Sequence, residues 1–191
     1  VGLVEVQCCW LVPGKRGLLL MGCCCGAAEL GLRTVRALFE SEAPALLAKA
    51  ASVATAAGGR LPMILPRDSD LHINVEHEYR PVGCLYTMGA AFVALLSLVL
   101  GRRPPGEVLV FGGVGNLGSL SGVATPLSGQ YVRAAFEAGY RRVFIGATCK
   151  VSEEAAAEAE AVGEDGRPRV SFIRKHTIMD VAAAVFGLEG A

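Results

Sequence analysis

The side chains best suited to nucleophilic chemistry gather just before a long apolar stretch. Within "RPVGCLYTMG", Cys84, Tyr86 and Thr87 carry a thiol, a phenol and a hydroxyl. Such groups attack a carbonyl when a neighbouring base takes the proton. His77 lies in the preceding loop, so a Cys84–His77 pair is one candidate arrangement, and a buried thiol with a solvated imidazole is the alternative. Tyr86 needs a stronger base, because a phenol has a pKa of about 10.

Basic partners for these groups are scarce. The chain has four lysines, namely Lys15, Lys49, Lys150 and Lys175. Lys15 falls in a predicted turn, Lys49 on the polar face of a predicted helix, and the other two follow predicted strands. Arg133 cannot replace a lysine, because a guanidinium stays protonated and is no general base.

The cysteines and glycines do not indicate a metal or a cofactor. Five of the seven cysteines stand in adjacent runs, and neighbouring residues of a strand point to opposite faces. No CxxC spacing marks a zinc site. The run "GGVGNLGSLSG" lacks the Walker G-K-[ST] and is explained by tight turns. The odd cysteine count predicts free thiols in a reducing, intracellular compartment, with cytoplasm and mitochondrion not distinguished.

The apolar periodicity of the chain switches between strands and helices. A strand, a turn at "PGKRG" and a returning strand predict an N-terminal hairpin. The alanine-rich segment that follows predicts a helix in two pieces, with Pro44 in the first turn of the second and an end at Gly58–Gly59. Further strands are expected at 70–78, 107–113, 141–147 and 169–175, and helices at 83–100, 126–140, 152–166 and 177–188.

The stretch from Pro81 to Gly101 contains 21 residues without a charge. Its length alone would suffice for a membrane span. Glycines and alanines make it less apolar than that count suggests, and both flanks alternate as in a soluble domain. We therefore expect a helix buried on all sides and no membrane.

These elements predict one domain, 1–191, of the α/β (α+β) class with a mixed sheet. The 191 residues allow a substantial core, and 52% of them are hydrophobic. The formal net charge is zero, which disfavours nucleic acid as a partner. Because the chain begins at Val1 without a methionine, we expect an excised domain, and an ATPase module upstream is left open.

The order of several motifs resembles the proteolytic domain of the Lon protease family. "DLHINVEHEYRPV" and "GAAFVALLSLVLGRRPP" resemble that family's D-[IL]-H strand and its apolar helix ending in T-G-R-P. "VEVQCCWLVPGKRGLLLMG" resembles its first hairpin, and "AAFEAGYRRVFIGA" resembles A-A-H-R-A-G-I-K-T-V-L-I-P. "VFGGVGNLG" also resembles the related C-terminal domain of the RadA recombination protein, which has no peptidase dyad.

The resemblance implies a serine–lysine dyad, yet this chain lacks both residues at the matching positions. Without gaps the serine position falls on Tyr86, beside Thr87, and with the TM pairs matched it falls on Gly83, beside Cys84. The lysine position falls on Leu127 without gaps, and on Ser128 or Gly129 when the downstream A-G is aligned.

We therefore expect a Lon-protease-like domain that keeps the fold but not the dyad, and that serves assembly or protein interaction. Family members pack in hexameric rings, so the resemblance implies self-association or docking to a larger complex. One alternative is a peptidase domain of an ATP-dependent Lon-type serine protease with displaced catalytic residues. Another is a nucleic-acid-linked scaffold like the RadA domain.

Overall fold

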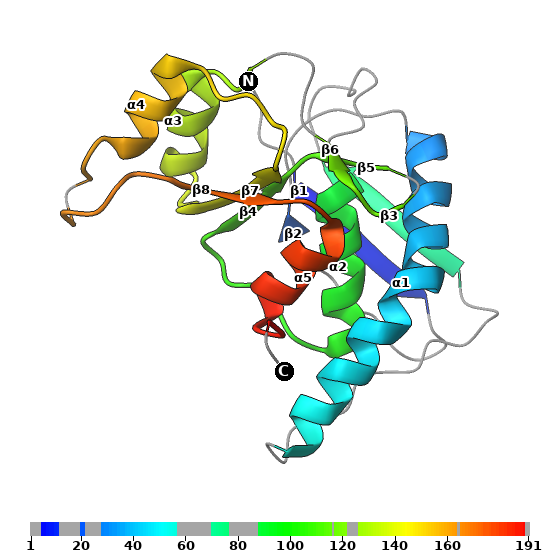
Figure 1. The fold of residues 1–191 in the computed structure, drawn as a ribbon. Helices are drawn as coiled ribbons and strands as arrows, with labels where there is room; N and C mark the ends of the chain where they lie inside the picture. Colours follow the sequence, from blue (N-terminus) through cyan, green and yellow to red (C-terminus); the bar gives the residue numbers. More distant parts are fainter. Residues whose placement is uncertain are drawn as a thin grey trace.

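The computed structural model shows helices packed around parallel and antiparallel strands (Figure 1). This arrangement confirms the predicted α/β class with mixed strand directions. The structure describes residues 5–11, 20–21, 28–56, 70–76, 88–115, 117–121, 126–163 and 165–189.

The first three strands form an antiparallel sheet. Strand β1 (Glu5–Leu11) lies between β2 (Leu20–Met21) and β3 (Asp70–Glu76). Val6 is opposite Met21 and Cys8 is opposite Ile73. The antiparallel pairing of β1 with β2 confirms the predicted N-terminal hairpin.

A parallel sheet follows in the second half of the chain. Its strands are β4 (Val108–Phe111), β7 (Arg142–Gly146) and β8 (Ser171–Lys175), in the order β4-β7-β8. Parallel neighbours need a crossover connection. Helix α3 (Gly129–Glu137) supplies it between β4 and β7, and α4 (Glu153–Glu160) between β7 and β8. The short strands β5 (Gly113–Val114) and β6 (Leu120–Ser121) pair with each other after β4.

Helices cover both faces of the parallel sheet (Figure 1). On one face, Leu109, Phe111, Val143 and Ile145 pack with α3 and α4. On the other, the alternate residues of the same strands pack with α1 (Ala28–Ala56), α2 (Met88–Leu100) and α5 (Ile178–Phe186). The period of two along each strand divides the core into these two layers.

Helix α2 is the centre of the larger layer. It contacts β1, α1, α5 and β4, and all of its side chains that the structure describes are buried. This confirms the predicted buried helix, although its expected beginning at 83–87 lies outside the described residues. In the part of the chain that the structure describes, none of the helices combines the length and apolarity needed to cross a membrane.

The predicted break at Pro44 is wrong, because α1 runs continuously from Ala28 to Ala56 with Pro44 inside it. Proline lacks the N–H that would bond to the carbonyl four residues earlier. The neighbouring Ala43 and Leu46 are buried in the core while Pro44 is exposed. Burial of this face therefore keeps the two halves in one helix.

Two predicted helix boundaries are confirmed. Gly139 follows α3 with a φ of 88°, which glycine adopts without strain. Thr177 and Asp180 form the expected capping box at the start of α5.

Candidate functional site

Helix α2 follows the segment of the sequence that holds the candidate nucleophiles. Gly83, Cys84, Tyr86 and Thr87 lie outside the described residues, as does His77. The described chain resumes at Met88, and the N–H of Gly89 donates to the carbonyl of Gly112 at 3.2 Å. A Cβ at Gly89 would lie 3.1 Å from that oxygen, so this end of α2 is held close to the end of β4.

His72 is placed on β3, where the family resemblance implies a structural strand position. Its backbone is opposite Cys9 of β1. It is therefore part of the antiparallel sheet.

The positions that the resemblance matches to the lysine lie in the described residues, and none of them carries an amine. Leu127 is 3% exposed and packs with Phe111, Tyr131 and Val143 between the parallel sheet and α3. Its N–H donates to the carbonyl of Lys150 at 2.9 Å. The side chain at this position thus adds to the apolar core.

The next two positions form the start of α3. Ser128 is the N-cap residue, but its side chain makes no capping hydrogen bond. Gly129 is buried, and a Cβ there would lie 2.6 Å from Oε1 of Glu154 and 2.9 Å from its Cγ. A lysine at Gly129 would have to displace Glu154, whose side chain is 62% exposed and therefore able to move. A carboxylate therefore approaches the start of α3, where the resemblance implies an amine.

The structure brings Lys150 beside Leu127, although the two residues lie far apart in the sequence. The chain after β7 runs next to Leu127, and the N–H of Ser152 donates to the Leu127 carbonyl at 3.0 Å. The Lys150 residue is exposed. Arg174 of β8 holds this loop, because its Nη1 donates to the carbonyls of Ala147 at 3.2 Å and Cys149 at 2.6 Å.

The other described lysines lie elsewhere. Lys175 pairs with Glu189 at 2.5 Å. Lys49 is on α1, and Lys15 lies outside the described residues. Arg133, which shares α3 with Gly129, points to α4 and pairs with Glu154 at 3.4 Å and Glu158 at 3.3 Å.

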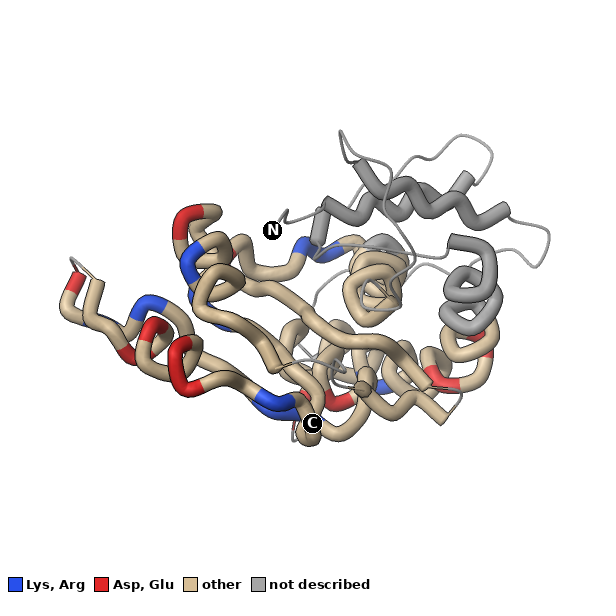
Figure 2. The backbone as a smooth tube through the Cα atoms, turned by 90° about the horizontal axis from the view of Figure 1, so that it is seen from above, with Lys and Arg blue, Asp and Glu red and all other residues tan. Residues whose placement is uncertain are grey.

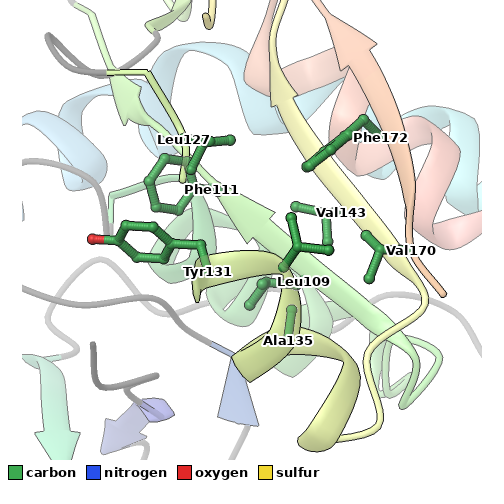
Figure 3. A pocket seen from close by; sticks show the side chains of 9 residues that line it. Leu109, Phe111, Leu127, Tyr131, Ala135, Val143, Val170 and Phe172 are labelled. Atoms are coloured by element: carbon green, nitrogen blue, oxygen red, sulfur yellow. The ribbon is translucent and has the colours of Figure 1, made fainter. Parts of the chain in front are cut away.

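A small cavity lies under the lysine position (Figure 3). Its volume is about 20 Å³, and its lining is formed by Leu127, Tyr131 and apolar residues of the parallel sheet and α3. That volume suits roughly one water molecule, yet a buried water needs polar partners. The cavity is a packing defect of the core and too small for a peptide side chain.

The described residues contain no group of three or more His, Cys, Asp or Glu side chains suited to a metal ion. Of the seven cysteines, Cys149 is the one whose side-chain surroundings are described, and it is a buried free thiol.

No model of a protein family matches the chain, and no curated protein does either.

The described geometry lacks one part that a serine–lysine mechanism requires. A lysine acts as a base when burial keeps it neutral near physiological pH. Leu127 has the buried, apolar surroundings for this but carries no amine, whereas Lys150 has the amine but is exposed.

Proposed function

We propose that this chain is a Lon-protease-like domain without peptidase activity, acting as an assembly or protein-interaction module. The observation that carries the proposal is the lysine position at the start of α3. It holds Leu127, Ser128 and Gly129, and the side chain that reaches it is the carboxylate of Glu154. A carboxylate beside a helix start stabilises the helix dipole but does not replace a neutral amine as the base of this dyad.

The packed core of the domain supports an interaction role that depends on the shape of its surface. Helix α2 belongs to one of two apolar clusters that cover the opposite faces of the parallel sheet. A Lon-protease-like domain without the dyad still presents a surface to which protein partners can bind. Further copies of the chain are among these partners.

The proposal is tested by peptide hydrolysis. Casein and fluorogenic peptides are incubated with the purified chain and with the Lys150→Met variant. We expect no turnover above buffer in either sample, because no described base is held in a buried site.

A second candidate is a peptidase whose base has been displaced to Lys150, and the position of this residue beside Leu127 favours it. Turnover that is present in the wild type, lost in Lys150→Met and lost in Thr87→Ala or Cys84→Ala would replace the first proposal with this one. Lys49→Met, on the distant helix α1, is the matched control for removal of one amine.

A further inference from the structure

The turn between α4 and β8 contains an aspartate followed by a glycine. Asp165 and Gly166 are both exposed, and the turn extends beyond the body of the domain in two views (Figure 1, Figure 2). Because glycine has no Cβ, the backbone nitrogen of Gly166 is open to approach by the preceding side chain. In this pair, therefore, no side chain of the second residue keeps the carboxyl of the first away from the next backbone nitrogen.

Backbone hydrogen bonds hold the shape of this turn. The Arg169 N–H donates to the Ala161 carbonyl at 2.9 Å. Closer to the tip, the Gly163 N–H donates to the Arg167 carbonyl at 2.8 Å. Gly166 has a φ of 74°, which glycine adopts without strain. The aspartate and the glycine are therefore at the tip of a short hairpin with a defined backbone.

The Asp165 carboxyl is folded over the turn toward the residues that follow it. Its Oδ1 accepts from the Arg167 N–H at 3.1 Å, and the same oxygen would lie 3.2 Å from a Cβ at Gly163. Aspartate favours this kind of bond to the backbone two residues ahead. The ring that the hydrogen bond closes contains both the Cγ of Asp165 and the backbone nitrogen of Gly166. The carboxyl carbon is thus held on the side of the chain where this nitrogen lies.

We infer that Asp165 is a site of spontaneous modification, at which the aspartate converts to isoaspartate through a cyclic imide. The lone pair of the Gly166 nitrogen attacks the Cγ of the protonated carboxyl, and a C–N bond forms. The N–H proton and the carboxyl hydroxyl leave together as one water molecule. A solvent water then breaks the bond between this nitrogen and the α-carbonyl carbon of Asp165. The main chain now runs through Cγ, the α-carboxyl is free, and nothing has been oxidised or reduced.

One hydrogen bond opposes this reaction. The Gly166 N–H donates to the Gly163 carbonyl at 3.1 Å, and it must be released before the nitrogen can attack. The bond lies at an exposed hairpin tip, where backbone hydrogen bonds open at low free energy. A Cβ at Gly166 would meet no atom within 4 Å, so no packed side chain stabilises the closed form at this position. The turn therefore slows the reaction only modestly.

Asp180 provides a comparison within the same chain. Its Oδ2 accepts from the Thr177 N–H at 3.1 Å in the capping box of α5, so the carboxyl is directed toward the residues before it. The next residue, Val181, is buried in the helix, and its branched side chain covers the backbone nitrogen. We therefore expect conversion at Asp165 and none at Asp180.

The test is peptide mapping of the purified chain during long incubation in warm neutral buffer. A synthetic peptide of residues 161–169 is incubated alongside, and sampling continues until most of the peptide is converted. Endoproteinase Asp-N cleaves before aspartate but not before isoaspartate, so loss of cleavage measures the conversion. We expect cleavage before Asp165 to be lost at a rate within about tenfold of that in the peptide, because bonds at an exposed tip open at low free energy. Cleavage before Asp180 should be retained.

Asp165→Glu is the control variant, because its longer side chain would have to close a six-membered ring. Protein isoaspartyl methyltransferase should methylate the turn of the incubated wild type and not that of Asp165→Glu, and circular dichroism confirms that both are folded. Three outcomes overturn the inference: conversion at Asp165 more than about tenfold slower than in the peptide, equal loss of cleavage before Asp180, or equal methylation of the Asp165→Glu turn. None of these readouts depends on the proposed function, because neither hydrolysis by the chain nor binding of a partner is measured.

Discussion

At the residue scale, the most informative side chain is Leu127. It is buried among apolar groups of β4, β7 and α3, next to the backbone of Lys150. An amine at this position would be desolvated, which disfavours its charged form and lowers its pKa. The position thus has the surroundings of a general base and the side chain of a core residue.

Leu127→Lys tests these surroundings. We expect the variant to lose about 3 kcal/mol or more of unfolding free energy at neutral pH, because the folded state must hold the introduced amine either buried and charged or deprotonated. The pKa of this amine is lower in the folded state than in the unfolded state, so the unfolded state binds more protons, and stability relative to wild type rises with pH up to about 10.4.

Chemical denaturation across this pH range measures the effect. Ser128→Lys is the matched control, since Ser128 is half-buried at the start of the same helix and an amine there reaches water. A pH-independent loss, equal in the two variants, would contradict the apolar description of position 127.

The sequence alone shows that none of the positions matched to the lysine by the family resemblance carries an amine, because this needs only a register and a count of four lysines. It is not sufficient to predict that Lys150 and Glu154 approach the start of α3. Both depend on how the loop after β7 and helix α4 pack against the start of α3, and such contacts between distant segments leave no periodic pattern in the chain.

At the element scale, α3 and α4 begin in contrasting ways. The Oγ of Ser152 accepts the N–H of Ala155 at 3.1 Å, whereas Ser128 makes no side-chain capping bond. We expect Ser152→Ala to lower the unfolding free energy by about 1 kcal/mol, and Ser128→Ala to change it by less than about 0.5 kcal/mol. Thermal melts compare the two variants. Equal losses would show that the two helix starts are capped alike.

The junction of β4 and β5 depends on a glycine. Gly112 has a φ of 153°, and a Cβ there would lie 2.8 Å from the carbonyl oxygen of Ser121. We expect Gly112→Ala to cost about 2–3 kcal/mol through backbone strain and this contact. Gly106, with no atom within 4 Å of an added Cβ, is the control, and Gly106→Ala should be neutral or slightly stabilising in urea denaturation. A Gly112→Ala variant as stable as wild type would contradict the described turn.

Most elements could be predicted from the apolar periodicity of the sequence and from the glycines and prolines that separate its segments. The hairpin β1–β2 pairs as expected, and α2, β4, α3, β7, α4, β8 and α5 lie within the expected ranges. The continuous helix through Pro44 could not be predicted, because local sequence rules place a proline at the start of a helix. The burial of Ala43 and Leu46 keeps this segment helical on both sides of the proline.

At the scale of the whole molecule, α2 contacts both three-stranded sheets. Phe92 is fully buried, and its ring centroid lies 5.9 Å from that of Phe39 on α1. We expect Phe92→Ala to lower the unfolding free energy by about 3–5 kcal/mol. Leu117→Ala is the control, because Leu117 is 91% exposed and should contribute within about 0.5 kcal/mol. Urea denaturation followed by circular dichroism gives both values, and a loss for Phe92→Ala as small as that for Leu117→Ala would contradict the central packing of α2.

The order of strands could not be derived from the sequence. Alternating strands and helices predict parallel pairing, but the composition of a strand does not indicate which strand it pairs with. The order β4-β7-β8 places β8 at the edge of the parallel sheet.

The central claim, a fold without a working dyad, is tested most directly by labelling with a fluorophosphonate probe followed by intact-protein mass spectrometry. Such a probe reacts with an oxygen nucleophile only when a base activates it. The account predicts the unmodified mass for wild type and for Lys150→Met alike. A stoichiometric adduct on wild type that disappears in Lys150→Met would contradict it.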